Sequence, residues 1–357
     1  MSAFNRMTSV LLGIFVVMGL TSCSSSQSQS FASDQAEETP VFVDTFNYED
    51  NASEFGGTVL VPTMEHAISK DSNAVYCVTM LYAWDKAREI FQEPLVIPSQ
   101  YRELQLLNAS TAHKNTLKPS EYMAEAIADS NRVFVRSRFE KDLPFDVKFN
   151  TFDNRLKFNG KTVPAFGKAG SYGSECQDQI KILYYQNDRH FLVKLIPEDP
   201  AHEILLYMPE RPFSTFSEMQ RKVNQLIEQG NRERVMEDSK WKYVFSVGDD
   251  ELLIPKFDFE ISTVYRSLIG NHFSVGQKDW TISKAWQQVA FHLDENGAAV
   301  KSEAVIEYYL GIEDTPERPQ PKKMIFDRPF YVLLKRADAS QPYFVLWVAN
   351  TELMVKE

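Results

Sequence analysis

The sequence lacks the short motifs that mark most enzyme, nucleotide and metal sites. It contains no Gly-rich phosphate loop, no His-x-x-x-His, no Cys-x-x-Cys and no Gly-x-Ser-x-Gly. The histidines are scattered at spacings that do not suit a metal site: His66, His113, His190, His202, His272 and His292. Asp294-Glu295 could bind calcium, but a lone acidic pair at a strand end is usually solvated. We therefore expect no catalysis, no metal and no cofactor.

Negative charge exceeds positive charge, and cysteine is scarce. The net charge of −11 argues against nucleic acid as a partner and against electrostatic docking on anionic lipid. Of three cysteines, Cys77 lies in an apolar run and is expected to be buried, which makes a Cys77–His nucleophile a poor candidate. Cys77 and Cys176 are distant in the sequence, so whether they form a disulfide is left open.

The N-terminus has the features of an export signal. Arg6 precedes an apolar run from Val10 to Leu20 that is too short for a stable membrane anchor. Leu20-Thr21-Ser22 then leads into Cys23, as in bacterial lipoprotein signals, with a plain secretory signal as the alternative. We expect a signal peptide over 1–22, lipid on Cys23, and a bacterial cell-envelope location on the outer membrane or cell surface.

The residues after Cys23 predict a tether and then one domain. Residues 23–40 are rich in Ser, Gln, Asp and Glu, which is typical of a flexible linker. Residues 41–357, with many aromatic residues and no visible boundary, are expected to form a single domain and a monomer.

The periodicity of hydrophobic residues and the positions of turn residues predict an α+β fold with mostly antiparallel sheets and helices clustered in the N-terminal half. Helices are expected from Val75 to Phe91 behind an Asp71-Ser72-Asn73 cap, at Tyr122–Ile127, from Ser214 to Gln229 with Gly230 ending it, and at Val264–Ile269. One further short helix is allowed between Gln92 and Ser120. The predicted strands are 132–139, 155–158, 161–166, 179–185, 191–195, 203–208, 251–261, 280–293, 330–335 and 343–348. Asn159-Gly160 predicts a hairpin turn.

The most unusual stretch runs from Val289 to Phe330. Val289, Phe291 and Leu293 alternate as in a strand with one buried face, and Gly297 then breaks that strand. After Gly297, one side of an extended chain would carry only small residues: Ala298, Val300, Ser302 and Ala304. A proline-rich, charged tract follows and cannot be a central strand. The stretch therefore predicts a loop with latent strand character, although an ordinary strand–loop–strand connection remains the simpler interpretation of these residues alone.

Five segments, in chain order, carry a family resemblance: Asn73-Ala-Val-Tyr76, Val133 to Gly170 with Phe158-Asn-Gly160, Leu253-Ile-Pro-Lys-Phe257, Val289 to Ala299, and Phe326-Asp-Arg-Pro-Phe330 with the hairpin to Asn350. Together they resemble the serpin family. The resemblance implies a serpin-like fold. It also implies inhibition of a target protease, which cleaves an exposed loop and is trapped when the freed segment inserts into the main sheet.

The resemblance assigns the candidate site. The hinge would comprise Glu295, Gly297, Ala298, Val300, Ser302 and Ala304, and the cleaved bond would lie near Leu310, Gly311 and Ile312. Three departures support a non-inhibitory serpin-fold lipoprotein, serving as a binding or structural module, as the alternative. The region 92–131 is short, Lys301 and Glu303 stand in the hinge, and the loop 298–325 is longer than usual.

Overall fold

The computed structural model describes residues 55–141, 143–170, 175–298 and 320–356. All of them belong to the unit Glu49–Glu357, which is separate from a first unit, Met1–Tyr48. The expected signal peptide, Cys23 and the tether lie outside the described residues. In the described part of the chain, no helix is long and apolar enough to cross a membrane.

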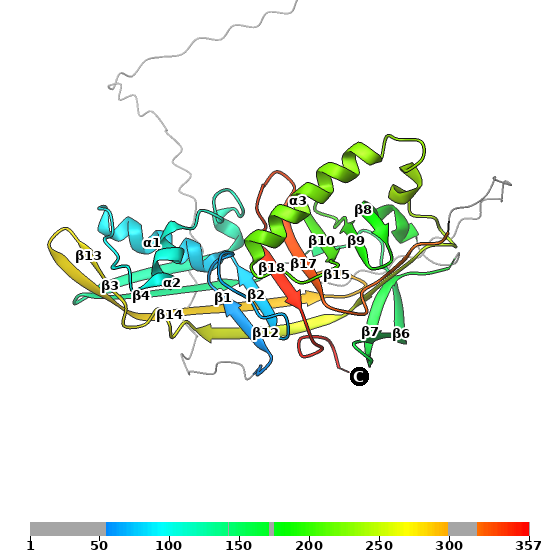
Figure 1. Cartoon of the computed structure of the whole chain (residues 1–357). Helices are drawn as coiled ribbons and strands as arrows, with labels where there is room; N and C mark the ends of the chain where they lie inside the picture. The colour runs from blue at the N-terminus through cyan, green and yellow to red at the C-terminus, as the bar shows by residue number, and fades with distance from the viewer. Residues whose placement is uncertain (1–54, 142, 171–174, 299–319, 357) are drawn as a thin grey trace, which may run out of the picture. The chain divides into compact units, whose positions relative to one another are not determined.

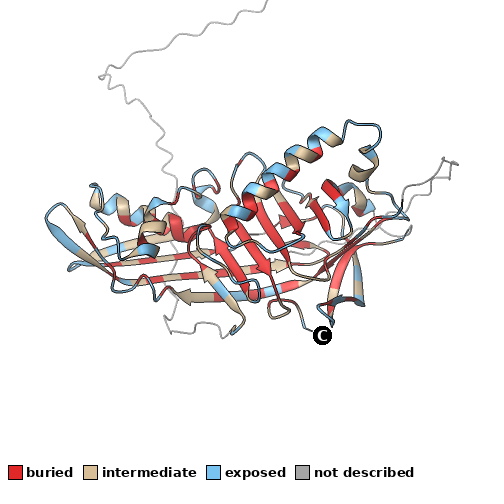
Figure 2. Cartoon of the chain, in the orientation of Figure 1, coloured by how far each residue is buried: buried red, intermediate tan, exposed pale blue. Residues whose placement is uncertain are grey.

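A seven-stranded sheet forms the most deeply buried part of this unit. Its order is β1-β2-β18-β17-β10-β9-β8, and every pair is antiparallel except β1·β2. The strands are β1 Thr58–Val61, β2 Asn73–Cys77, β8 Ile180–Asn187, β9 His190–Leu195, β10 His202–Met208, β17 Phe330–Arg336 and β18 Phe344–Val348. Buried residues run almost without a break along β10, β17 and β18, as Figure 2 shows, because both faces of these strands are covered. Helix α3 Phe216–Glu233 packs against β8 (Figure 1).

The second sheet contains the long strands. Its order is β12-β14-β4-β3, with β13 pairing to the far end of β14. The bounds are β3 Met123–Asp129, β4 Arg132–Phe139, β12 Phe257–Val264, β13 His272–Val275 and β14 Lys278–Leu293. Helix α1 Thr79–Phe91 packs against β3 and β4, and α2 Arg102–Ala109 contacts α1. Burial alternates along β4 and β14 (Figure 2), so this sheet has one covered face and one more open face.

Two smaller sheets complete the described fold. A four-stranded sheet has the order β16-β11-β7-β6, and a two-stranded sheet joins β15 to β5. The bounds are β5 Leu143–Pro144, β6 Asn150–Phe158, β7 Lys161–Lys168, β11 Glu251–Pro255, β15 Gly297–Ala298 and β16 Lys323–Ile325. Three short 3₁₀ helices connect the elements: η1 Pro119–Glu121, η2 Glu175–Gln179 and η3 Lys240–Tyr243. The fold is therefore α+β, as the sequence predicts, with two helices early and one in the middle.

The helix predicted from Val75 begins later than expected. Asn73–Cys77 is the strand β2, and α1 starts at Thr79. All five residues of β2 are buried, so this stretch has no hydrophobic period that could distinguish a strand from a helix. The Asn73 side chain does not cap a helix. Its Oδ1 accepts from the backbone N–H groups of Ala349 and Asn350, at 2.8 and 3.0 Å.

Two further helix predictions are wrong. The alanine-rich stretch predicted as a helix at Tyr122–Ile127 is the strand β3, because pairing with β4 along its whole length outweighs alanine's helix propensity. Ser130 and Asn131 alone join β3 to β4, and both have positive φ, as a tight hairpin requires. At Val264–Ile269, β12 runs through Val264 and a turn follows, ended by Gly270 at φ +80°.

Gly230 does not end the middle helix. Helix α3 continues to Glu233, and its N-cap is Thr215, whose Oγ1 accepts from the Glu218 N–H at 3.1 Å. A Cβ on Gly230 would lie 1.9 Å from the Leu183 carbonyl oxygen, so the glycine permits close packing of α3 on β8.

The loop expected over 298–325 ends earlier than predicted, because Lys323–Ile325 forms β16 and pairs in parallel with β11.

Candidate functional site

The candidate site is the seam between β4 and β14. These strands are parallel neighbours, paired from Arg132↔Thr281 to Phe139↔Val289 with one register shift. On their outer sides, β14 pairs antiparallel with β12 and β4 pairs antiparallel with β3. The seam is therefore the one parallel step in the order β12-β14-β4-β3. A strand that ran opposite to both neighbours would fit between them in antiparallel register.

Immediately after β14 the chain reverses direction. Asp294 and Gly297 form an antiparallel bridge, with their backbone groups bonded in both directions at 3.1 and 3.2 Å. Gly297 and Ala298 then pair antiparallel with Pro144 and Leu143, which form β5 beyond the end of β4. The short strand β15 also contacts β14. The chain thus already runs backward between the continuations of the two seam strands.

Gly297 is required at this reversal. Its φ is +111°, a region that side-chain-bearing residues rarely adopt. A Cβ there would lie 2.4 Å from the Leu143 carbonyl oxygen and 2.5 Å from Pro144 Cα. The strand ends before Gly297, because β14 stops at Leu293, and Gly297 is the first residue of β15, where its φ and the close backbone approach require a glycine.

Glu295 holds the turn to the neighbouring elements. Its side chain lies 2.5 Å from Lys256 Nζ and 3.6 Å from Lys148 Nζ, and its carbonyl oxygen accepts from the Phe149 N–H at 2.9 Å. The glutamate and Lys256 are both largely buried. Burial raises the pKa of the Glu295 carboxyl and the Asp294 charge adds to this, but the hydrogen bond from Lys256, a backbone hydrogen bond and the Lys256 charge together outweigh them, so the pKa lies below its ordinary value.

A buried hydrogen-bond network centred on Gln287 lies under the middle of the seam. Gln287 of β14 donates through Nε2 to the Cys77 carbonyl oxygen at 3.0 Å and to Thr79 Oγ1 at 2.8 Å, and its Oε1 accepts from Tyr265 Oη. Its partner across the seam is Ser137 of β4, whose buried Oγ has no hydrogen-bond partner. Side-chain bonds therefore tie β14 to the start of α1, but Gln287 is not bonded to the hydroxyl across the seam.

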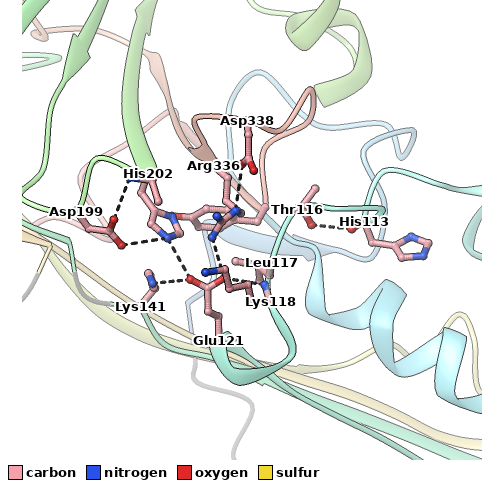
Figure 3. Close-up of polar contacts among 12 residues, drawn as sticks. His113, Thr116, Leu117, Lys118, Glu121, Lys141, Asp199, His202, Arg336 and Asp338 are labelled. Atoms are coloured by element: carbon pink, nitrogen blue, oxygen red, sulfur yellow. Dashed lines mark hydrogen bonds and ion pairs between the residues drawn. The ribbon is translucent and has the colours of Figure 1, made fainter.

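A second polar cluster includes Lys141, two residues after the end of β4 (Figure 3). Glu121 Oε1 accepts from Lys141 Nζ at 2.7 Å and lies 3.1 Å from His202 Nε2, and Arg336 approaches its other oxygen at 3.6 Å. His202 Nδ1 lies 3.1 Å from Tyr343 Oη. These residues come from η1, the segment after β4, strands β10 and β17, and the residue before β18. The cluster joins the end of β4 to the seven-stranded sheet.

The far end of the long loop is also fixed. Lys322, just before β16, pairs with Asp250 at 2.8 Å, and both side chains are almost fully buried. The second Asp250 oxygen accepts from the Lys322 backbone N–H at 2.7 Å, and Lys322 Nζ donates to the Trp241 carbonyl oxygen at 3.3 Å. The loop thus returns to the core at a buried ion pair.

The structure describes part of the expected hinge. Glu295 and Gly297 come together in the turn, and Ala298 is placed in β15. Val300, Ser302, Ala304, Leu310, Gly311 and Ile312 lie outside the described residues.

Cys77 and Cys176 are both buried and are not joined in a disulfide. Burial raises the pKa of the Cys77 thiol to about 12, which disfavours the thiolate that a nucleophile needs.

Several residues of the site were not predicted. Gln287 could have been found, because it falls on the buried side of the alternation with Val289 and Phe291, where a polar residue needs partners. Lys256 and Lys322 could not, since their acidic partners are distant in the sequence and only the sheet topology brings them together.

Comparison with solved structures finds serpins. Human thyroxine-binding globulin complexed with thyroxine is 16% identical, with 63% of this chain and 58% of that chain covered and a TM-score of 0.39. A highly specific serpin of the insect Tenebrio molitor is 14% identical, with 71% and 66% covered and a TM-score of 0.34. Tengpin, a thermophilic serpin in its native state, is 13% identical, with 71% and 63% covered and a TM-score of 0.37.

This chain therefore covers less than two thirds of the length of each of these solved chains. No protein-family model matches the chain, and no curated protein matches it.

Proposed function

We propose that this chain is a serpin-like protease inhibitor that traps its target by inserting a cleaved loop into the seam between β4 and β14. The observation that carries the proposal is the reversal at Asp294–Gly297. It directs the chain into antiparallel pairing with β5, beside β14, before any cleavage. The insertion would extend a pairing that has already begun.

The registers on the two sides of the hinge are consistent with each other. Continued from Gly297↔Pro144, the pairing would bring Ser302 opposite Phe139 of β4. Continued from Asp294↔Gly297, it would bring Ser302 opposite Val289 of β14. Phe139 and Val289 are themselves partners across the seam. One inserted strand could therefore satisfy both neighbours in the same register as far as Lys284 and Phe134, where the seam has its register shift.

The same register separates the loop residues by face. Val300, Ser302 and Ala304 would fall opposite Phe291, Val289 and Gln287, which are all buried. Lys301 and Glu303 would fall opposite Ala290 and Gln288, which are half-buried. The two charged residues that support the non-inhibitory alternative would thus take the more open face of the inserted strand, where they would not oppose insertion.

The length of the seam supports a cleavage site near Leu310. In this register Leu310 would come level with Thr281, the last residue of β14 that pairs with β4. Cleavage next to Leu310, Gly311 or Ile312 would release a strand as long as the seam. Insertion would replace one parallel pairing by two antiparallel pairings and bury the small side chains, so the cleaved protein would be more stable.

The chemistry would be that of the target protease. Its nucleophile would attack the carbonyl carbon of the residue before the cleaved bond, and the new N-terminus would leave. Insertion would then carry the acyl-enzyme along the sheet before water could hydrolyse it. This chain would supply the bait and the strand, and lipid on Cys23 would hold it at the bacterial envelope as a monomer.

The test is incubation of the chain from Val41 onward with a panel of serine and cysteine proteases. We expect a covalent adduct on a denaturing gel and a large upward shift in the melting temperature of the cleaved chain. Ala304→Asp would place a charge opposite Gln287 and should abolish the adduct, because an unpaired buried charge opposes insertion. Glu303→Ala, on the open face, is the matched control and should leave the adduct unchanged.

The outcome separates the two candidate functions. Clean cleavage without an adduct, and with an unchanged melting temperature, would eliminate the inhibitor. It would leave a serpin-like scaffold that binds partners at the cell surface.

A further inference from the structure

His292 lies at the start of the hinge, and the proposed insertion does not use its side chain. It is the second-last residue of β14, on the half-buried side of the alternation. Its ring Nε2 lies 3.2 Å from the Asp294 carboxylate, and its Nδ1 lies 3.5 Å from the Asp258 carboxylate. Asp258 is its direct partner on β12, and Asp294 begins the turn that ends at Gly297. One imidazole therefore stands between a neighbouring strand and the turn.

The Asp294 carboxylate shapes that turn. Its Oδ1 accepts from the Asn296 N–H at 2.7 Å, and its Oδ2 accepts from the Asn296 side-chain amide at 3.0 Å. The backbone bridge between Asp294 and Gly297 then closes the reversal. The Asp294 side chain is 16% exposed, whereas that of Asp258 is 72% exposed. A positive charge on His292 therefore matters most to Asp294, because an enclosed carboxylate has lost most of its water.

The groups around the ring favour its protonated form. The hydrogen bond to Asp294 is the largest influence on the pKa of His292, and the charges of Asp294 and Asp258 add to it, so the pKa lies above its ordinary value although burial opposes this. Glu260, two residues along β12 on the same face, accepts instead from Gln288.

The next acidic residue of the turn, Glu295, has cations of its own. It faces Lys256 and Lys148, at 2.5 and 3.6 Å. Although burial raises the pKa of Glu295, its hydrogen bonds and the Lys256 charge bring it below the ordinary value, so it stays ionised near neutral pH. Of the described groups around the turn, His292 is thus the one suited to change charge near neutral pH.

We infer that His292 is a positioning residue of the hinge, which acts through Asp294 and makes capture of the protease depend on pH. The inference rests on the proposed function. In the protonated ring both nitrogens carry a proton, so Asp294 receives a charge-assisted hydrogen bond and the turn is held ready for insertion. In the neutral ring one nitrogen has lost its proton, and Asp294 keeps at most an uncharged hydrogen bond. The turn would then open more often, and hydrolysis of the acyl-enzyme would compete better with insertion.

The experiment measures how many inhibitor molecules are consumed per adduct at pH 6, 7, 8 and 9. The probes are chymotrypsin, elastase and papain, and the protease used is the one that forms an adduct with the unmodified full chain. Variants are compared at the same pH, so the pH dependence of the protease itself cancels. A second measurement needs no protease: the protection factor of the Gly297 amide, which donates to the Asp294 carbonyl oxygen at 3.2 Å, in hydrogen exchange of the uncut chain.

We expect the unmodified chain to consume about three-fold more inhibitor per adduct at pH 9 than at pH 6, with a parallel fall in the protection of Gly297. His292→Gln should give the high value at every pH. Asp294→Asn still offers an acceptor to the Asn296 N–H but should also remove the pH dependence. His292→Lys keeps a positive charge over this range and should give the low value throughout.

His66→Gln is the matched control, in the connection between β1 and β2. Burial lowers the pKa of His66, so its ring stays neutral over this range and the substitution should leave the pH dependence unchanged. A pH dependence that persists in His292→Gln, or one that His66→Gln also removes, would overturn the inference and leave the inhibitor intact. Equal values for the unmodified chain at all four pH values would do the same. No adduct with the unmodified chain at any pH would overturn the proposed function, and the inference with it.

Discussion

At the scale of single residues, the ion pair of Glu295 and Lys256 holds the turn that follows β14. Both side chains are largely buried, and Lys256 has no other carboxylate among the ion pairs of the described residues. Glu295→Gln would leave the ammonium buried without a countercharge. We expect it to lower the free energy of unfolding by roughly 2–4 kcal/mol, measured by urea denaturation.

The double variant Glu295→Gln with Lys256→Met is the control for this prediction. It removes both charges and should recover most of the loss.

The contribution of Glu295 to stability should depend on pH in a definite direction. The pKa of Glu295 is lowered in the folded state, so its stabilisation is present above the carboxyl's unfolded pKa and is lost as the pH falls through the folded value. Glu295→Gln should therefore flatten the acid limb of the stability curve, and an unchanged acid limb would contradict the assignment.

Gly297 allows a prediction with a matched control in the same chain. Gly297 and Gly160 both have positive φ, but a Cβ on Gly160 would meet nothing within 4 Å, whereas one on Gly297 would meet the backbone of Leu143 to Phe145. Gly160→Ala therefore measures the cost of backbone conformation alone, about 1 kcal/mol. Gly297→Ala should cost clearly more in thermal unfolding. It should also weaken the hydrogen bond that the Phe145 N–H donates to the Asn296 carbonyl oxygen at 2.9 Å, and so expose that amide to hydrogen exchange. Equal costs would mean that the turn is not tightly packed against β5.

At the scale of elements, the long strands with one covered face were predicted well. The strand at 132–139 has the predicted bounds, 280–293 differs only at its start, and the hairpin at Asn159-Gly160 has the expected partners. Alternation is a direct consequence of one buried face, so it is visible in the sequence. The elements that were misassigned carry other signals: β2 is buried on every side, and β3 is alanine-rich.

Of the candidate site, the sequence predicted only the segment that follows β14. Gly297 and the small residues after it predict the hinge, because both signals depend on local sequence. The pairing with β5, the hydrogen-bond network at Gln287 and the ion pair at Lys322 depend on contacts between residues far apart in the chain. No local pattern records which distant segments the sheets bring together.

The seam itself can be locked to test whether it must open. Val135 of β4 and Ala285 of β14 are direct partners across it, and both are fully buried. Neighbouring strands lie about 4.8 Å apart, within the span of a disulfide. With Val135→Cys and Ala285→Cys, the oxidised chain should be cleaved by the protease but should form no adduct, because β4 and β14 cannot separate.

Reduction of the same double-cysteine variant is its control. The reduced chain should regain the adduct, and the native Cys77 and Cys176, both buried, should remain unmodified under mild oxidation. An oxidised chain that still forms the adduct would show that the loop does not enter this seam.

At the scale of the whole described unit, we expect the polar cluster around His202 to make stability depend on pH. The imidazole of His202 is buried between Glu121 and Tyr343, with Asp199, Lys141 and Arg336 also facing it. Burial lowers the pKa of His202, with the charges of Lys141 and Arg336 acting in the same direction and those of Glu121 and Asp199 opposing. His292, next to Asp294 in the hinge, has a raised pKa, chiefly because it hydrogen-bonds the Asp294 carboxylate.

These two histidines should act on stability in opposite directions. A lowered histidine pKa gives stability that is complete above the unfolded value of about 6.5 and is lost as the pH falls below it. A raised pKa gives stability that is complete below that value and is lost as the pH rises through the folded pKa. Urea denaturation at pH 5, 6, 7 and 8 should therefore show a smaller loss toward pH 5 for His202→Gln than for the unmodified chain, and a larger loss for His292→Gln. Parallel curves for all three proteins would mean that neither imidazole changes protonation differently in the folded and unfolded states, and that the cluster joins the two sheets through packing alone.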